Sequence, residues 1–269
     1  MNMLSMDNEA LIRLGSFFGI FALMSVWEVL APKRELTTSK AVRWSSNLAI
    51  TFINSLLLRF IFPVLAIGVA YIGTEQGLGI LNKVEIPELL SGLIAIILLD
   101  FAIYAQHYAF HMLPHPWRLH MMHHTDMDID VTTGARFHPI EILLSMCIKV
   151  SIVIIIGAPP WAVLIFEVLL NATAMFNHSN VNIPVSIDRV LRLFVVTPDM
   201  HRVHHSVIIR ETNSNYGFNF PWWDRIFKTY NAQPVKGHTG MKIGLANFRD
   251  PKRLTLPWLL AIPFLGKDR

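Results

Sequence analysis

Four long apolar runs constrain the fold of this sequence more than any other feature. They cover residues 10–30, 47–73, 87–113 and 139–176. About 20 apolar residues are enough to cross a bilayer as a helix, and the second and third runs meet that length easily. The fourth run is broken at 157–160 by Gly-Ala-Pro-Pro, where proline cannot continue a helix because it lacks a backbone donor. We therefore predict an all-α integral membrane protein with about four transmembrane helices.

The fourth run is most simply a helical hairpin with two arms of about 18 residues, which is short for spanning helices. Its arms either cross the membrane or re-enter it from one side. The composition agrees with a membrane protein, since 53% of the residues are hydrophobic and only 16% are charged. A typical soluble domain has roughly 25% charged residues, so we expect lipid to surround most of this chain.

The single cysteine, Cys147, excludes several kinds of site. An intrachain disulfide, a four-cysteine zinc site and a protein-ligated iron–sulfur cluster each need several thiols from one chain. The net charge of +4 does not indicate a nucleic-acid partner. The basic residues flank the apolar runs and do not form one basic face, which is what nucleic-acid binding requires.

The positions of the basic residues predict how the chain crosses the membrane. The loop after the first run carries four of them: Lys33, Arg34, Lys40 and Arg43. The region after His178 holds 13 Lys or Arg against 6 Asp or Glu, whereas loop 74–88 holds one Lys against three Glu. Because cytoplasmic loops carry the excess of Lys and Arg, we predict an external N-terminus and a cytoplasmic, His-rich helical cap. Residues 1–9 contain no Lys or Arg, so no secretory signal peptide is expected there.

The chain holds 12 histidines, and eight of them fall into three clusters. The clusters are His107 and His111, then His120, His123 and His124, and finally His201, His204 and His205. Residues three and four apart share one side of a helix, so each cluster can direct its imidazoles at a metal ion. Bare imidazoles gain nothing from packing together and repel one another once protonated. Eight neutral ligands are too many for one ion, so the sequence predicts two neighbouring ions.

Residues near the first cluster are expected to support this centre. Asp100 and Tyr104 precede His107 by seven and three residues and continue its helix face. A carboxylate in such a position can orient an imidazole through its second nitrogen, which is the role expected of Asp100. His178 follows the hairpin and is expected to be a ninth ligand.

The third cluster is expected to lie on a helix that begins at Thr197 or Asp199, since either side chain can cap a helix. Asp199 is expected to lie beside the metal ligands without binding the metal. The same is expected of His138, which lies in Arg-Phe-His-Pro at 136–139. His115 and His238 lie apart from the clusters and are interpreted as ordinary histidines.

The metal itself is less constrained, because imidazole suits zinc, copper, iron and nickel alike. A zinc hydrolase is the main competing enzyme class, yet the chain has no HExxH motif, and neither HxxHH motif offers a glutamate as general base. A non-catalytic metal-binding protein is a further alternative. A transporter site is expected near the bilayer midplane, whereas these clusters lie at one face.

The order of these motifs resembles that of the fatty acid hydroxylase superfamily, most closely its bacterial sterol desaturase branch. The supporting stretches are 117–124, 133–141 and 197–206, with Asn-Tyr-Gly at 215–217 and Trp-Asp at 223–224. The resemblance implies a membrane di-iron enzyme that uses dioxygen and two electrons to hydroxylate or desaturate an unactivated C–H bond of a lipid. It also implies that the eight clustered histidines bind iron, with zinc possible in purified protein, and that His178 matches an additional histidine of the family.

Electrons are expected from a separate ferredoxin, cytochrome or flavoprotein reductase. The chain has no G-x-G-x-x-G fingerprint, no thiols for a cluster and no haem domain, and its basic cytoplasmic region offers a docking face for an acidic carrier. The other expected partners are a lipid substrate and the membrane, which is the inner membrane if the cell is bacterial. We divide the chain into transmembrane helices at 1–95, a catalytic domain at 96–245 that contains hairpin 139–176, and an interfacial tail at 246–269.

Overall fold

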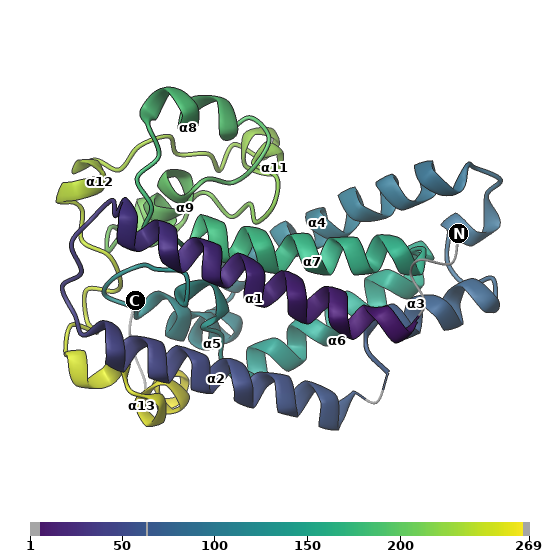
Figure 1. Cartoon of the computed structure of the whole chain (residues 1–269), viewed down its shortest axis with the longest axis horizontal. Coiled ribbons are helices and arrows are strands. Elements are labelled where there is room, and N and C mark those ends of the chain that lie inside the picture. Colours follow the sequence, from purple (N-terminus) through teal and green to yellow (C-terminus); the bar gives the residue numbers. More distant parts are fainter. Residues whose placement is uncertain (1–5, 63, 266–269) are drawn as a thin grey trace.

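The structure, a computed structural model, describes residues 6–62 and 64–265 of the 269 in the chain. Five long helices run roughly along its longest axis (Figure 1). They are α1 (Met6–Leu30), α2 (Lys40–Ile61), α4 (Glu88–Met112), α6 (Pro139–Ile156) and α7 (Pro160–Asn177). Each overlaps one of five segments that are long and apolar enough to cross a membrane. The prediction of an all-α fold built on membrane-length helices is confirmed.

Short helices form a cap at one end of this bundle, on the left of Figure 1. They are α5 (Pro114–His124), α8 (Val185–Leu191), α9 (Pro198–His204), α10 (Ile209–Thr212), α11 (Trp222–Ile226), α12 (Gly237–Gly240) and α13 (Leu256–Ala261), with the 3-10 turns η2 (Thr133–Ala135), η3 (Pro251–Leu254) and η4 (Ile262–Phe264). The opposite end carries α3 (Ala66–Glu75) and η1 (Leu81–Lys83). Within residues 6–62 and 64–265 there is no strand, only two isolated β-bridges.

The hairpin of α6 and α7 forms as the sequence predicts, with two arms of 18 residues each. Gly157 ends α6 with a φ of 70°, a left-handed conformation that a glycine adopts without strain. Pro160 then starts α7 at a position where its missing N–H costs nothing. The Gly-Ala-Pro-Pro break is therefore a tight turn between two antiparallel helices.

Close packing holds α4 against α7 in the bundle. A Cβ atom on Gly92 would lie 1.9 Å from the Trp161 ring, so any larger residue there would force the helices apart. Ala95 of α4 and Ala162 of α7 are fully buried in the same cluster, which continues to Phe166. Small residues at such a contact allow the helix backbones to approach each other, as is common between membrane helices.

The second apolar run, at 47–73, forms two helices where the sequence predicts one. Helix α2 ends at Ile61, Phe62 is extended, and α3 begins at Ala66. The helix α3 packs against α6 and α7 at the end far from the cap. The division lets the chain turn and cover the hairpin there.

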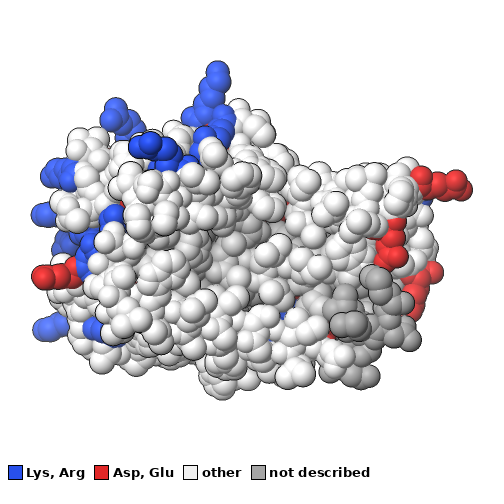
Figure 2. All heavy atoms as spheres, turned by 45° about the horizontal axis from the view of Figure 1, so that its top comes forward, with Lys and Arg blue, Asp and Glu red and all other residues white. Residues whose placement is uncertain are grey.

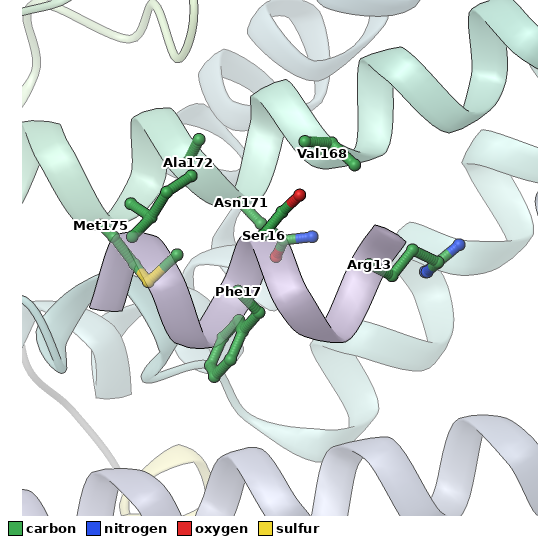
Figure 3. Close-up of a pocket in the computed structure, with 8 residues that line it drawn as sticks. Arg13, Ser16, Phe17, Val168, Asn171, Ala172 and Met175 are labelled. Carbon is green, nitrogen blue, oxygen red and sulfur yellow. The ribbon is translucent and has the colours of Figure 1, made fainter. Parts of the chain in front are cut away.

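One buried ion cluster lies inside the bundle, between α1, α6 and α7. Glu167, which is 2% exposed, accepts hydrogen bonds from Arg13 and Lys149. The cavity beside it, between α1 and α7, has a volume of about 10 Å³ (Figure 3), which is room for about one water molecule. Its polar lining includes Arg13, Ser16 and Asn171. We interpret this cluster as paired charges that fix three helices together.

Charged residues lie mainly at the two ends of the molecule. Figure 2 shows Lys and Arg gathered over the cap and Asp and Glu at the opposite end, with mostly uncharged surface between them. Such a charge-free belt is typical of a bundle that spans a membrane, and the basic end is typical of the cytoplasmic side.

The C-terminal segment, α13 and η4, is the part of the cap that packs against α2 and α5. Leu259 and Ile262 are fully buried against Ile50 of α2 and Met121 of α5, whereas Phe264 is 64% exposed. This segment therefore covers the helix that bears the second histidine cluster. Residues 266–269 of the predicted tail lie outside the described residues.

Candidate metal centre

The end of α4 and two cap helices bring the clustered histidines together. His107 and His111 lie in the last two turns of α4. Because Leu113 is extended and Pro114 is the first residue of the next helix, α5 follows at once with the second cluster. Thr197 caps α9, its Oγ1 accepting from the backbone nitrogen of Met200 at 3.3 Å.

All nine predicted ligands meet at this point, and none is more than 5% exposed. They form two groups, in each of which the candidate ligand atoms lie within 4.8 Å of one another. The five-histidine group is His107, His111, His120, His124 and His204. The four-histidine group is His123, His178, His201 and His205.

Both HxxHH motifs divide their histidines in the same way. The first and last histidines of a motif, four residues apart, belong to one group, and the histidine three residues after the first belongs to the other. Thus His123 belongs to the four-histidine group, whereas the other two histidines of α5 belong to the five-histidine group. In the third cluster, His204 belongs to the five-histidine group and the other two histidines to the four-histidine group. Side chains four apart differ by about 40° around a helix, and those three apart by about 60° in the opposite sense. Each motif therefore contributes to both groups.

Hydrogen bonds fix the protonation of four of these rings. In each, Nδ1 lies within 3.0 Å of a backbone carbonyl oxygen. The pairs are His107 with Tyr216 at 2.8 Å, His123 with Arg136 at 3.0 Å, His178 with Ala174 at 2.8 Å, and His204 with Ser214 at 2.7 Å. A carbonyl oxygen only accepts, so Nδ1 carries the proton and Nε2 presents a lone pair. This is the tautomer that binds a metal through Nε2.

Nitrogen lone pairs of neighbouring rings point at one another, and a bound cation would relieve their repulsion. The Nε2 atom of His178 lies 3.1 Å from Nε2 of His123 and 3.0 Å from Nε2 of His201. With both Nδ1 atoms protonated, His178 and His123 direct two lone pairs at each other. Both ring nitrogens of His124 and of His205 are buried without a hydrogen-bond partner. Buried polar atoms are rarely left unpaired, so this donor set fits metal ions.

Burial keeps these imidazoles neutral. Desolvation lowers the pKa of His178 and of His204 to about 3. A histidine binds a metal only in its neutral form, so both side chains are ready to act as ligands at neutral pH.

Two residues that sequence reasoning missed hold two of the rings in the five-histidine group. Nδ1 of His120 lies 2.6 Å from Oε1 of Glu141, and Nδ1 of His111 lies 3.3 Å from Oδ1 of Asn213. Glu141 is 3% exposed and lies in the first turn of α6. Two sequence signals pointed to Glu141: its place in the first turn of the helix that follows His138, and its position at the end of the stretch 133–141 that supports the family resemblance.

A second buried polar region adjoins the centre. It is formed by residues 125–136, which we call the aspartate loop, together with Arg43 of α2. Asp126 accepts from Nε and Nη2 of Arg43 at 2.6 and 2.9 Å, and Asp130 accepts from Nη1 at 2.6 Å. Arg136, at the end of the loop, is the residue whose carbonyl accepts from His123. The loop therefore connects the ion pairs to the four-histidine group.

Asp100 does not orient an imidazole, which corrects the prediction made for it. Its Oδ2 accepts from Nε1 of Trp223 at 2.8 Å, and Nδ1 of His107 binds the Tyr216 carbonyl instead. The physical reason is distance along α4, because seven residues separate Asp100 from His107 by about 10 Å. Asp100 instead holds the cap helix α11 against α4.

The other residues expected around the ligands bind elsewhere. The Tyr104 hydroxyl lies 3.0 Å from Oγ1 of Thr229. His138 caps α6, its Nδ1 accepting from the backbone nitrogen of Ile140 at 3.2 Å. Asp199 is paired with Arg202 and with Lys33. These three side chains shape the surrounding helices and do not hold a ligand ring through the hydrogen bonds seen here.

Comparisons with known proteins agree with this geometry. A family model described as fatty acid hydroxylase matches residues 92–229. Ornithine lipid hydroxylase from Rhizobium tropici is 28% identical over 157 residues, which are 58% of this chain and 46% of that protein. Alkylglycerol monooxygenases from Caenorhabditis elegans and Homo sapiens are each 28% identical, over 50% and 57% of this chain and 26% and 33% of their own lengths.

The match thus spans less than half the length of these curated relatives. No solved structure matches the chain significantly. The family match covers half of the chain, from the bundle helix α4 to the cap, and it contains all nine histidines of the two groups. This chain belongs to the fatty acid hydroxylase family.

Proposed function

We propose that this chain is a membrane-bound, dioxygen-dependent lipid hydroxylase with a di-iron centre. One observation carries the proposal: nine buried histidines direct their ligand atoms into two adjacent groups at the cap end of a membrane-length bundle. The two groups would each hold one iron ion. When bound, the irons would supply the activation of dioxygen, of which one oxygen atom enters a C–H bond and the other takes up two protons and leaves as water.

The residues of the chain would hold the metals and keep water out. The Phe137 ring stacks on His123 with centroids 4.6 Å apart. The Phe218 ring lies edge-on to His107 at 6.1 Å and is tilted against His178 at 6.2 Å. An apolar lining of this kind protects a reactive centre from side reactions with solvent. The C–H bond supplies two of the electrons, and an external donor must supply the other two.

The substrate is proposed to be a membrane lipid. Both kinds of relative act on lipids, as their names state, and the centre lies where α4 meets the cap. A lipid could therefore reach it from the adjoining leaflet. A desaturase outcome, with loss of two hydrogens and no oxygen gained, is the competing product of the same centre.

The basic cap is proposed to face the cytoplasm, because positive charge is retained on that side. In a bacterial cell the protein would lie in the inner membrane. The same charge would attract an acidic electron carrier such as a ferredoxin, a cytochrome or a reductase.

The test is turnover with isotopically labelled dioxygen. Iron-loaded protein in lipid nanodiscs, supplied with a reduced ferredoxin and a lipid extract, should yield a lipid that has gained one labelled oxygen atom. His204→Ala should abolish that product, whereas His115→Ala, at an exposed histidine outside both groups, should not. A labelled product from both variants at the wild-type rate, or lipid hydrolysis without oxygen uptake, would overturn the proposal.

A further inference from the structure

On one side of the cap, charged side chains are buried and apolar side chains are exposed, which is the reverse of what is usual in water. In and just after α8, Asp188 and Arg192 are only 4% and 6% exposed and form an ion pair. Ile187 and Val190 are 51% and 57% exposed on the same helix, and Phe194 is 63% exposed. A surface helix in water buries its apolar residues and exposes its charges. This segment is built for apolar surroundings.

The neighbouring helix α11 shows the same reversal. Asp224 is fully buried, whereas Ile226 and Phe227 are 62% and 51% exposed. The two segments are joined, because Nε1 of Trp222 donates to the carbonyl of Leu193 at 2.9 Å. Together they form one surface, on the same flank of the bundle in Figure 1. We call it the apolar shoulder: Ile187, Val190, Phe194, Trp222, Ile226 and Phe227.

The shoulder continues the exposed side of a membrane-length helix. The rings of Trp223 and Phe227 lie 4.9 and 5.8 Å from that of Phe101 in α4. Ile97 and Leu98 of α4 are 40% and 38% exposed, and residues three and four before Phe101 share its helix face. Phe101 lies 11 residues before the end of α4, which is about 16 Å along the axis. The shoulder therefore lies beside α4 and not beyond its end.

The exposed charge near the shoulder is entirely positive. All four acidic residues between positions 185 and 228 are buried, whereas the basic residues Arg189, Arg225 and Lys228 are exposed. Each is the immediate neighbour in sequence of an exposed apolar residue of the shoulder. Basic residues combined with exposed aromatic and aliphatic side chains are typical of surfaces that lie in the headgroup region of an anionic leaflet.

We propose that the apolar shoulder inserts into the leaflet at the cap end of the bundle, with its basic residues among anionic lipid headgroups. The structure couples this surface to the metal centre. Asp224 of α11 accepts from the backbone nitrogen of Tyr216 at 2.8 Å, and the carbonyl of Tyr216 accepts from His107 at 2.8 Å. Insertion of the shoulder thus sets the depth of the five-histidine group relative to the leaflet. This holds whichever metal the centre binds.

Site-specific quenching in nanodiscs tests the proposal. In a Cys147→Ser background, the full chain would carry a fluorophore at Ile187→Cys or at Ile226→Cys, in bilayers that contain anionic lipid and spin-labelled acyl chains. Leu93→Cys, 49% exposed on α4, is the lipid-facing reference, and Lys236→Cys, exposed in the cap, is the aqueous one. The metal content of each variant reports whether its fold is intact. Two independent shoulder positions keep the test decisive if one of them fails to fold.

We expect both shoulder labels to lose as much fluorescence to the acyl-chain quencher as the Leu93→Cys label, and the Lys236→Cys label to lose little. Iodide in the water should give the reverse order. Shoulder labels that behave like Lys236→Cys would overturn the proposal. Labels shielded from both quenchers, in nanodiscs that hold two chains, would overturn it too, because a second copy would then cover the surface.

Discussion

Two buried polar regions lie side by side in the cap, and their hydrogen bonding differs. In the aspartate loop, every side-chain nitrogen of Arg43 donates a hydrogen bond, and so does every side-chain nitrogen of Arg136. In the histidine groups, lone pairs face one another and the ring nitrogens of His124 and His205 lack partners. The first region is complete within the chain, whereas the second needs something the chain does not supply.

This difference separates a structural network from a binding site. Burying a polar group is costly unless it is paired, so the facing lone pairs of His178 and His123 and the unpartnered ring nitrogens of His124 and His205 call for a ligand. In the loop, burial raises the pKa of Asp126, but Arg43 and Arg136 outweigh that effect and bring its pKa below the ordinary value. The carboxylate is therefore charged and compensated. Burial alone does not mark the functional site, whereas a cluster of buried ligand atoms without partners does.

The largest expected loss of stability comes from breaking the ion pairs of the aspartate loop. Arg43→Met would leave Asp130 buried without its guanidinium partner and Asp126 with only Arg136 at 4.0 Å, which should cost about 3–5 kcal/mol of unfolding free energy. Denaturant or thermal unfolding in mild detergent would measure it. Arg43→Lys keeps the charge and should lose less. Equal stability of Arg43→Met and the wild type would show that these ion pairs do not hold the loop.

Removing metal from the two histidine groups should cause the next largest loss of stability. When the free metal concentration is about 100 times the dissociation constant of a site, metal binding stabilises the fold by about 2.7 kcal/mol. Chelation should therefore lower the unfolding temperature of the wild type, and restored metal should raise it again. An unfolding temperature that is the same with chelator and with metal would contradict the comparison.

Glu141→Gln should weaken metal binding without removing a ligand. Glutamine still offers an oxygen to Nδ1 of His120 but lacks the charge, and changes of this kind typically cost about tenfold or more in affinity. A competition titration with a chromophoric chelator should show the loss for one of two metals. Glu35→Gln, at an exposed position, is the matched control. Unchanged affinity for both metals in Glu141→Gln would mean that this carboxylate only fills space.

The smallest effect is expected for the metal-free His178→Ala variant. Truncation loses packing contacts but also relieves the facing lone pairs of His178 and His123, so the net change should be about 1 kcal/mol or less. Chemical unfolding in the presence of chelator, with Arg43→Met measured under the same conditions, would give this change in unfolding free energy. A loss as large as that of Arg43→Met would mean that both regions are structural.

Much of the centre was predictable from the sequence because helical spacing is regular. The intervals of three and four residues predicted shared faces and two ions, and all nine expected histidines meet. The spacing could not assign each ring to a group, because that depends on how α5 and α9 are oriented relative to each other in the tertiary fold. It also could not distinguish Arg43 from Lys40. Both were interpreted as cytoplasmic charges of a loop, yet Arg43 is fully buried in α2.

The supporting contacts were harder to predict for a related reason. Four of the rings are held by backbone carbonyls, which every residue carries and no motif reveals. Asp100 was expected to serve a histidine because it shares a helix face with His107. Its partner is Trp223, 123 residues away in sequence, so only the tertiary fold brings them together.

The central claim is that the chain holds two metal ions in two separate histidine groups. Elemental mass spectrometry of iron-loaded protein tests it most directly, with His178→Ala from the four-histidine group and His107→Ala from the five-histidine group. We predict two irons per wild-type chain and about one in each variant, if each group binds its own ion. One iron in the wild type, or the same metal content in all three proteins, would contradict the claim.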